Sequence, residues 1–456
     1  MKNLPRILGW TLLAVAVLAS TATAENTNGN LRSSTGNRIS YLDEKNPFYP
    51  DANFPALITP QWVGESNIQA VVILAVDDML EPKIYETFLR PILERLKKID
   101  GRAPVSIMTE AIPANDSQAQ IWLKEGLSLE VHTIKHPCPL LADGDFNSAA
   151  ETYFSGIDLM NKIPGNKPVA FRMPCCDSMN SPSPRFYAEI FNRPSPDGNF
   201  LTIDTSVMNI FTTNDAKLPR ELTMDTDGRE RFRKYFPSQT NATTRISLEA
   251  FATTIENYPY PYVIGKLCWE FPCAAPSDWE AHNFHGSTNE TTIADWKAGI
   301  DNTVIKQGVF TMVFHPHGWI RAQQMIDLID YAQKKYGDKI KFLTFREAQE
   351  RLDKNLLSGQ PLRDAKGEDN GVRLLDLNHD GFMDVVIGNE QVRKTRLWNP
   401  SENRWSETDF PIALVSRDST GNTRDRGVKF GIVQTNHFVT AFYRDEKSKG
   451  AWHFDG

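Results

Sequence analysis

The hydrophobic residues of this chain form short apolar runs that alternate with longer amphipathic stretches between residues 70 and 354. Short runs rich in β-branched residues are typical of strands buried in a parallel sheet, whereas apolar residues spaced three and four apart are typical of helices. The pattern predicts strands at residues 70–76, 104–108, 127–131, 168–171, 200–204, 262–267, 309–314 and 339–342, and helices at residues 81–99, 117–125, 146–162, 184–191, 291–305, 320–336 and 346–354. Pro91 is expected to kink or split the first of these helices.

Strands and helices in alternation predict an α/β fold with a parallel sheet, here a deformed (β/α) barrel of seven or eight units. In such a barrel the carboxyl ends of the strands converge on one face, and that face carries the active site. Residues 205–260 fit the alternation poorly. We therefore expect an insertion there that shapes one wall of a cleft.

The pattern changes after residue 354. Residues 355–371 are polar and rich in turn-forming residues, which is typical of a linker. Residues 372–456 contain short strand-like runs, such as 427–432 and 437–443, without a helix pattern. We therefore expect a small, separate all-β unit after the barrel.

The N-terminal region has the pattern of a secretion signal at residues 1–24. This pattern consists of a positive start, an apolar segment and small residues suited to cleavage, at Lys2 and Arg6, residues 7–19 and residues 22–24. The apolar segment is shorter than the roughly 20 residues that span a bilayer, and an uncleaved membrane anchor is the alternative. We expect a secreted, periplasmic or cell-surface protein without stable membrane insertion after cleavage, whose mature chain begins with an extension at residues 25–69.

Composition narrows the functional classes. The chain has 456 residues, of which 40% are hydrophobic and 23% charged, and these values are ordinary for globular proteins. Its formal net charge is −7 and it contains no long basic run, so we expect no nucleic-acid partner.

Polar residues of the kind that perform catalysis follow four of the predicted strands. They are Asp77 and Asp78 after the first strand, His132 and His136 after the third, Arg172 after the fourth, and His315 and His317 after the seventh. Because strand ends converge in a barrel, we expect these side chains to lie close together despite their separation in sequence. Neighbouring side chains of an extended segment point to opposite sides, so one carboxylate of the first pair can bind a metal while the other faces a substrate.

The order of these motifs resembles that of the NodB-homology polysaccharide deacetylases, carbohydrate esterase family 4, over about residues 70–354. The second motif of that family is matched in full, and three others in part, by His132-Thr133-Ile134-Lys135-His136-Pro137, Ala75-Val76-Asp77-Asp78-Met79, Arg172-Met173-Pro174-Cys175 and Val313-Phe314-His315. The sequence departs from the family where Ala75, Val76 and Met79 replace Thr, Phe and Gly, and where Cys175 replaces Tyr. These departures affect the expected substrate more than the expected reaction.

The resemblance implies which residues bind a metal and which perform the reaction. Asp77 would be the general base, Arg172 would orient it, and His315 would be the general acid. Asp78, His132 and His136 would hold a divalent metal. Zinc is favoured because three protein ligands leave an open position, although cobalt, nickel or manganese suits the same ligands.

Three details of this assignment stay open or rest on the resemblance alone. His317 is the alternative acid, but His315 directly follows the strand. The acidic residue that orients the acid belongs to Asp278-Trp279 or to Asp295-Trp296, and we prefer the second pair because it is nearer to His315 in sequence. The backbone N–H of Cys175 is expected to face the tetrahedral oxyanion.

We therefore expect a secreted, metal-dependent deacetylase that removes N- or O-acetyl groups from a polysaccharide such as chitin, xylan or peptidoglycan. The alternative is a non-catalytic carbohydrate- or surface-binding protein on the same fold. A glycoside hydrolase ranks below both. It needs two carboxylates that flank the scissile bond, whereas Asp77 and Asp78 are adjacent and compete for a metal.

The five cysteines of an exported protein are candidates for disulfides. Cys268 and Cys273 are close in sequence, and we expect them to pair. Cys138 follows the histidine loop and is expected to pair with Cys175 or Cys176, which follow Arg172. Buried thiols are the alternative, and a cysteine-ligated metal ranks below both.

The C-terminal region carries the spacing of a calcium-binding loop. Such a loop has oxygen ligands at positions 1, 3, 5, 7 and 9 and a glycine at position 6. Here the ligands would be Asp376, Asn378, Asp380, the carbonyl of Phe382 and Asp384, and the glycine is Gly381. An EF-hand would need flanking helices and Glu at position 12, where this chain has Ile387. The stretch therefore resembles the FG-GAP/VCBS repeats of β-propellers. One repeat cannot close a propeller, so the unit is either a truncated propeller or packs on the barrel.

Overall fold

In the computed structural model, the apolar run that begins at Ala70 forms strand β2 (Ala70–Met79), and almost all residues of this strand are buried. The structure describes residues 40–42, 48–141, 144–176, 182–236, 254–444 and 448–456, and residues 40–456 form one compact unit. The predicted secretion signal at residues 1–24 and residues 25–39 of the extension lie outside the described residues.

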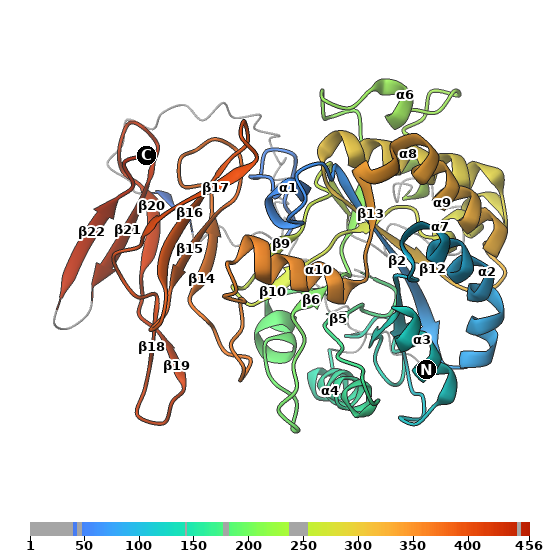
Figure 1. Ribbon diagram of the computed structural model, residues 1–456, viewed down its shortest axis with the longest axis horizontal. Coiled ribbons are helices and arrows are strands. Elements are labelled where there is room, and N and C mark those ends of the chain that lie inside the picture. The colour runs from blue at the N-terminus through green and yellow to red at the C-terminus, as the bar shows by residue number, and fades with distance from the viewer. Residues whose placement is uncertain (1–39, 43–47, 142–143, 177–181, 237–253, 445–447) are drawn as a thin grey trace, which may run out of the picture. The chain divides into compact units, whose positions relative to one another are not determined.

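β2 lies in the middle of a large curled sheet (Figure 1). The strand order is β8-β7-β11-β12-β2-β3-β4-β5-β6-β10-β9, and β13 also pairs with β2. The bounds are β3 (Val105–Thr109), β4 (Ser128–Val131), β5 (Ala170–Phe171), β6 (Ile203–Asp204), β7 (Met208–Ile210), β8 (Thr254–Glu256), β9 (Tyr262–Ile264), β10 (Cys268–Glu270), β11 (Cys273–Ala274), β12 (Val309–Phe314) and β13 (Ile340–Phe342). The predicted parallel α/β sheet is confirmed. β8 and β9 are the two ends of this order and do not pair with each other among the described residues, so the sheet is a half-barrel.

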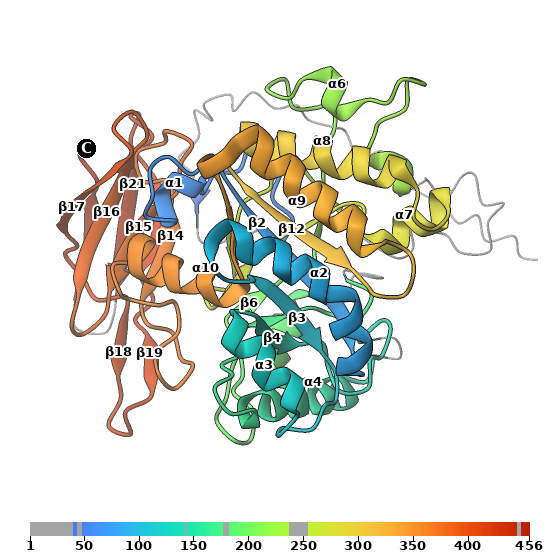
Figure 2. The same ribbon diagram turned by 45° about the vertical axis from the view of Figure 1, so that its right-hand side comes forward.

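Helices connect the strands and cover the outer face of the sheet. They are α1 (Thr59–Trp62), α2 (Pro82–Asp100), α3 (Ser117–Glu125), α4 (Phe146–Lys162), α5 (Pro184–Phe186), α6 (Arg220–Thr223), α7 (Asp278–His285), α8 (Glu290–Lys306), α9 (Ala322–Tyr336) and α10 (Phe345–Arg351). α9 packs between α2 and α8 beside β2 and β12 (Figure 2). α2 continues through Pro91, so the expected split is absent from this helix. No helix in the described ranges is both long and apolar enough to cross a membrane.

The segment predicted as an insertion, residues 205–260, contributes directly to the sheet. β7 pairs in parallel with β11 and with β8, and both β7 and β8 lie in this segment. The expectation of an insertion outside the strand pattern was therefore wrong for these two strands. Each has only three residues, too few for a periodic pattern to be recognised in the sequence.

The C-terminal region is all-β, as predicted, and forms two four-stranded antiparallel sheets and one hairpin. The first sheet contains β14 (Val372–Leu375), β15 (Asp384–Gly388), β16 (Arg393–Asn399) and β17 (Arg404–Asp409). The second has the order β1-β20-β21-β22, with β1 (Ser40–Tyr41), β20 (Lys429–Ile432), β21 (Val439–Arg444) and β22 (Lys449–His453), and the hairpin consists of β18 (Val415–Arg417) and β19 (Thr423–Asp425). β1 belongs to the N-terminal extension, so the second sheet joins two distant parts of the chain.

The segment predicted as a linker packs against residues 191–201, which precede β6 of the large sheet. Arg363 is 2% exposed and donates hydrogen bonds to the carbonyl oxygens of Phe191, Asn192 and Leu201 at 3.3, 2.8 and 2.9 Å. Residues 352–356 continue α10 as a π-helix. The path between the two regions is thus fixed by buried hydrogen bonds.

Candidate active site

The two adjacent carboxylates near the end of β2 face different surroundings. The register between β2 and β3 shifts between Val76 and Met79, and Asp78 has a left-handed backbone with φ of 63°. Non-glycine residues with positive φ are strained and cluster at functional sites. The same conformation occurs nearby at Thr133, His136, Cys175 and Cys176.

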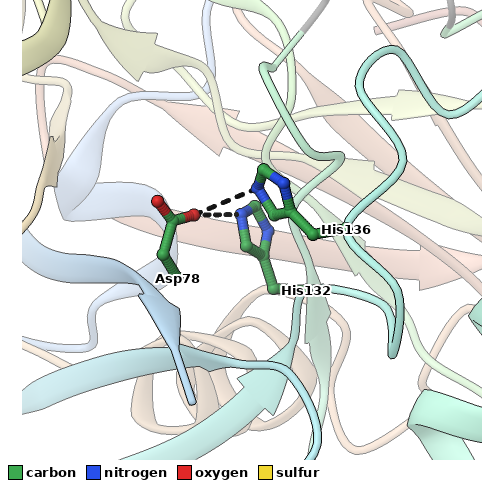
Figure 3. Close-up of side chains that lie close together, drawn as sticks. All are labelled: Asp78, His132 and His136. Atoms are coloured by element: carbon green, nitrogen blue, oxygen red, sulfur yellow. Dashed lines mark hydrogen bonds and ion pairs between the residues drawn. The ribbon is translucent and has the colours of Figure 1, made fainter. Parts of the chain in front are cut away.

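Asp78 lies against two histidines of the loop that follows β4 (Figure 3). Nε2 of His132 and Nε2 of His136 each lie 3.1 Å from Oδ1 of Asp78. Nδ1 of His132 lies 2.8 Å from the carbonyl oxygen of Arg172. A carbonyl can only accept, so Nδ1 donates its proton to the carbonyl oxygen of Arg172, and Nε2 is the ring atom that faces Asp78.

These three residues fit a divalent metal ion. Their ligand atoms all lie within 4.8 Å of one another. A metal ion bound by Nε2 of His132 and Oδ1 of Asp78 would replace the hydrogen bond that joins these two atoms at 3.1 Å. A backbone carbonyl that holds the proton on Nδ1 is a common way to orient a metal-binding histidine.

The protonation state of Asp78 also suits metal binding. Burial raises the pKa of Asp78, but hydrogen bonds from His132, His136 and His317 lower it more, so the net pKa is well below its usual range. The carboxylate is therefore ionised at physiological pH, as a metal ligand must be. The side chains of Asp78, His136 and His317 are 23%, 29% and 37% exposed, so the cluster is open to solvent on one side.

Asp77 forms a buried ion pair with Arg172, the residue that follows β5. Nη1 of Arg172 lies 2.5 Å from Oδ1 of Asp77, and the two side chains are 0% and 4% exposed. Nε and Nη2 of Arg172 donate to the carbonyl and hydroxyl oxygens of Thr205 at 3.0 and 3.2 Å. Burial lowers the pKa of Arg172, but Asp77 raises it more, so the guanidinium stays charged and holds Asp77 in one orientation.

His315 follows β12 and is held by Asp278, the first residue of α7. Nδ1 of His315 lies 2.7 Å from Oδ1 of Asp278, and the backbone N–H of His315 donates to Oδ2 at 2.8 Å. Burial lowers the pKa of His315, but Asp278 and the two carboxylates at the end of β2 raise it to about 9. Its Nε2 lies 3.7 Å from Oδ2 of Asp78, so a protonated ring presents its free proton to the metal cluster.

The preference for Asp295 over Asp278 was wrong. Asp295 lies on α8 and is occupied by another cluster, in which Arg231 donates to its Oδ1 at 2.8 Å and Lys234 lies 2.7 Å from its Oδ2. Tyr235 donates to the same Oδ2 at 2.6 Å. Distance along the chain favoured Asp295, but the start of α7 packs beside β12 and brings Asp278 to His315.

His317 stands beside the cluster in a different position. Its Nε2 lies 3.0 Å from Oδ2 of Asp78, and its ring stacks on that of His315 at 5.3 Å between centroids. The ring of Trp319 lies 5.0 Å from each of these two histidines and stacks on His282 at 5.6 Å. The ring of Trp319 thus lines the site beside the two histidines. The sequence analysis did not assign it, although Trp319 ends the run His-Pro-His-Gly-Trp at residues 315–319.

Glu110 is a second residue that the sequence analysis missed. It follows β3 directly, at the same edge of the sheet as the other site residues. Burial raises its pKa, while the nearby charges of His136 and His132 oppose this rise. A carboxylate immediately after a predicted strand was the signal that could have identified it.

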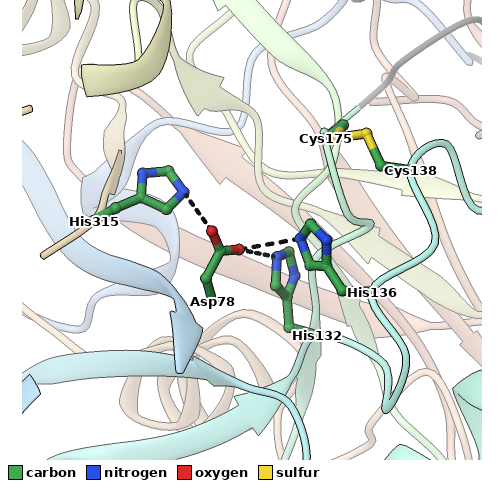
Figure 4. Close-up of a disulfide and its surroundings, with 6 residues drawn as sticks. All are labelled: Asp78, His132, His136, Cys138, Cys175 and His315. Atoms are coloured by element: carbon green, nitrogen blue, oxygen red, sulfur yellow. Dashed lines mark hydrogen bonds and ion pairs between the residues drawn. A yellow bond between two sulfur atoms is a disulfide. The ribbon is translucent and has the colours of Figure 1, made fainter. Parts of the chain in front are cut away.

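A disulfide joins the two loops that border the cluster (Figure 4). Cys138, two residues after His136, is bonded to Cys175, three residues after Arg172, with Cα atoms 5.7 Å apart. The expected pairing of Cys138 is thus confirmed, with Cys175 as its partner. The bond ties the loop that bears the metal-binding histidines to the loop that bears Arg172.

The expected bond between Cys268 and Cys273 was wrong, since both are buried free thiols, as is Cys176. Cys268 lies in β10 beside β6 and β9, whereas Cys273 lies in β11 beside β7 and β12. Cys273 donates its thiol proton to the carbonyl oxygen of Thr205 at 2.9 Å. Their proximity in sequence is lost because the chain moves from one part of the sheet to another between them.

The predicted calcium loop connects β14 and β15. Asp376 accepts the backbone N–H groups of Asp380 and Gly381 at 3.0 and 2.9 Å, which closes the turn. Asp384 is 0% exposed, and burial together with the charges of Asp380 and Asp376 raises its pKa to about 7. The side-chain oxygen of Asn378 is buried without a hydrogen-bond partner among the described residues. Carboxylates that repel one another in this way are stabilised by a cation.

Comparison with known proteins gives matches in structure only. No protein-family model matches the chain, and no curated protein matches it. A candidate polysaccharide deacetylase from Mycobacterium smegmatis is 15% identical, with a TM-score of 0.39 over 68% of this chain and 96% of that chain. The Puue allantoinase is 12% identical, with a TM-score of 0.38 over 65% and 93%. Peptidoglycan deacetylase PdaC from Bacillus subtilis is 15% identical, with a TM-score of 0.32 over 66% and 97%.

Proposed function

We propose that this protein is a secreted, metal-dependent deacetylase that removes N- or O-acetyl groups from a polysaccharide. One observation carries the proposal. Asp78 of the Asp78–His132–His136 cluster follows Asp77, which pairs with Arg172, and its Oδ2 lies 3.7 Å from Nε2 of His315, which pairs with Asp278. Hydrolysis of an amide or ester needs an activated water, a base and an acid within reach of one carbonyl group, and this arrangement supplies residues for each role.

Asp78, His132 and His136 would hold the metal ion, with zinc as the first candidate. When bound, the ion would act as a Lewis acid on the acetyl carbonyl and lower the pKa of water. The backbone carbonyl of Arg172 keeps His132 in the tautomer that binding needs. The lowered pKa of Asp78 keeps its carboxylate ionised at neutral pH, as binding of the metal requires.

Asp77 would act as the general base. Its carboxylate is held by Arg172 and does not lie in the metal cluster, so it can take a proton from the attacking water. The backbone N–H of Cys175 would face the oxyanion of the tetrahedral intermediate. The disulfide from Cys175 to Cys138 supports the position of this N–H.

His315 would act as the general acid. Nδ1 is held by Asp278, so Nε2 carries the proton that is donated to the leaving amine or alkoxide. With a pKa of about 9, His315 is protonated at neutral pH. The pairing with buried Asp278 supports His315 as the acid in preference to the more exposed His317.

The proposal is tested by metal analysis together with acetate release from acetylated chitin, xylan and peptidoglycan fragments. His132→Ala and His136→Ala should each lose metal and activity together. Asp77→Asn and His315→Ala should keep the metal and lose about 10²–10⁴-fold in kcat.

His453→Ala is the matched control, because His453 lies in β22, where Nδ1 contacts Thr440, and it should change neither quantity. Metal that stays stoichiometric in both histidine variants of the cluster would refute the ligand assignment. Wild-type protein that binds metal and releases no acetate from any of the three substrates would favour the alternative of a non-catalytic carbohydrate- or surface-binding protein.

The loop at residues 376–384 is our second proposed site, for calcium. The buried Asp384 carboxylate and the unpartnered oxygen of Asn378 support a cation there. Calorimetric titration of the full chain with calcium should give a binding heat that Asp376→Asn removes. Asp418→Asn is the control, since Asp418 caps an exposed turn through Thr420 and lacks the calcium spacing. An unchanged heat in Asp376→Asn would refute the calcium site at this loop.

A further inference from the structure

The position of Arg172 depends on a short buried turn just past β6, formed by residues 205–207. Thr205 accepts two hydrogen bonds from the guanidinium of Arg172, at 3.0 and 3.2 Å. Ser206 accepts the backbone N–H of Met173 through its hydroxyl oxygen at 2.9 Å. The turn therefore fixes both the side chain of Arg172 and the backbone that follows it.

Asp204 holds this turn from the other side. Its Oδ1 accepts the backbone N–H of Thr205 at 2.8 Å and the hydroxyl of Ser206 at 2.5 Å. Its Oδ2 accepts the hydroxyl of Tyr187 at 2.7 Å. Asp204 is 0% exposed, so all three donors compensate for the burial of one carboxylate.

Glu270 holds the same turn from the neighbouring strand. β10 pairs in parallel with β6, and Glu270 lies directly beside Asp204 in this pairing. Oε1 of Glu270 accepts the backbone N–H groups of Ser206 and Val207 at 3.1 Å each. Oε2 is buried and has no hydrogen-bond donor in the part of the chain that the structure describes.

Two ionised carboxylates side by side in a dry interior repel each other, and one shared proton removes this repulsion. Three donors make Asp204 the better place for the negative charge. When Oε2 of Glu270 carries a proton, it can donate a hydrogen bond to the carboxylate of Asp204. Burial raises the pKa of both groups, that of Asp204 to about 6, and the charge of Asp204 contributes to raising the pKa of Glu270 well above its usual range.

We propose that Asp204 and Glu270 form a carboxylate–carboxylic acid pair that holds one proton and positions Arg172 through the turn at residues 205–207. This inference rests on the proposed function, in which Arg172 orients the base. Neither carboxyl group touches the reacting groups, so both are positioning residues.

The titratable side chains that face the pair come from α4, the π-helix at Tyr187–Phe191, β9, β10 and β11, and they are Tyr153, Tyr187, Tyr262, Cys268 and Cys273. Burial raises the pKa of the three tyrosines and of Cys268 well above their usual values, so these groups are neutral at neutral pH. Burial also raises the pKa of the Cys273 thiol, but Cys176 and Arg172 lower it more. Loss of the shared proton as pH rises places a second negative charge among these groups.

Three variants separate the roles of shape, proton and charge. Glu270→Gln keeps the shape and a donor but cannot ionise, so kcat at pH 7 should stay within about twofold of wild type. Glu270→Ala removes the acceptor of the backbone N–H groups of Ser206 and Val207. Asp204→Asn removes the negative charge that accepts hydrogen bonds from three donors. Each should lower kcat by about tenfold or more with little change in KM, because the base is displaced.

A second measurement needs no substrate. The NMR signal of the Arg172 Nε–H group, assigned by its absence in Arg172→Lys, reports the bond to Thr205. It should shift in Glu270→Ala and return to the wild-type position in Glu270→Gln. Asp353→Ala is the matched control, because burial raises the pKa of Asp353 to about 6 but the residue lies outside this network, and the signal should not move.

Thermal unfolding as a function of pH tests the proton directly. A carboxyl group with a raised pKa in the folded state makes stability fall as pH rises through that pKa. The melting temperature of wild type should therefore fall more steeply than that of Glu270→Gln as pH rises above about 4.3, the pKa of a glutamate in the unfolded chain. Damage by Glu270→Gln equal to that by Glu270→Ala, in kcat and in the Arg172 signal, would overturn the proposal. Wild-type protein without deacetylase activity would refute the proposed function, while the NMR and pH series would still decide on the proton pair.

Discussion

Asp77, Asp78 and His315 of the candidate site each have a partner that fixes the charge or the orientation of the side chain. Arg172 holds Asp77, Asp78 lies against the two cluster histidines, and Asp278 holds His315. The partners differ in kind, a guanidinium for the proposed base and a carboxylate for the proposed acid. Arg172 holds Asp77 in one orientation, and the charge of Asp278 favours the protonated form of His315.

Asp278→Asn should move the alkaline loss of activity to lower pH. Burial lowers the pKa of His315, whereas Asp278 is the largest contribution that raises it to about 9. In the proposed mechanism the protonated ring of His315 is the acid, so wild-type kcat should be lost as pH rises through about 9. Without the Asp278 charge the pKa falls, and the loss begins earlier. Initial rates of acetate release between about pH 6 and 10 measure the shift.

Asp295→Asn is the control for this prediction. Asp295 holds Arg231, Lys234 and Tyr235 and does not contact His315, so its loss should lower the melting temperature without moving the alkaline limb. A shifted limb in Asp295→Asn together with an unshifted limb in Asp278→Asn would restore Asp295 as the orienting residue.

The contrast between these two residues shows what the sequence could predict at this scale. His132 and His136 were identifiable because both belong to one local motif. The partner of His315 depends on how α7 and α8 pack against β12, which no local pattern records. Distance in sequence was the only guide, and it pointed to the wrong aspartate.

At the scale of elements, the strands that carry the site were predictable and the order of the sheet was not. β2 and β12 are long apolar runs, and their burial follows from composition alone. β7, β8 and β11 have two or three residues each, and their places in the sheet come from tertiary pairing. β1 pairs with β20, so residues 40–41 contact residues 431–432. A local sequence pattern cannot predict a contact between residues so far apart in the chain.

The loop disulfide gives a direct chemical prediction. Denatured, unreduced protein should show three reactive thiols, those of Cys176, Cys268 and Cys273, and reduction should expose all five cysteines. Titration with a thiol reagent measures both numbers. Cys268→Ser should lower each count by one and confirm the method. A single reactive thiol in the unreduced protein would show a second bond in addition to Cys138–Cys175.

The two regions of the chain share backbone contacts as well as side-chain contacts. Ala56 forms a bridge with Phe382, and the side chain of Gln61 donates to the carbonyl oxygen of Met383 at 2.9 Å. Trp405 donates through its indole N–H to the carbonyl oxygen of Gln61 at 3.0 Å. The predicted boundary at residues 355–371 therefore marks a change of secondary structure, and it is crossed by hydrogen bonds that the N-terminal extension supplies.

We therefore expect residues 40–456 to unfold in one cooperative transition in differential scanning calorimetry, with the predicted domains melting together. Arg396 connects the regions, since it donates to the carbonyl oxygens of Asn355 and Leu356 and lies over the ring of Trp405. Arg396→Ala leaves buried carbonyls without donors and should cost about 2 kcal/mol, which lowers the single transition without splitting it. Arg404→Ala is the matched control: its side chain is 72% exposed and pairs only at the surface with Glu402, so the transition should not move. Two separate transitions in the wild-type protein would show instead that the β-sheets of the C-terminal region fold as an independent domain.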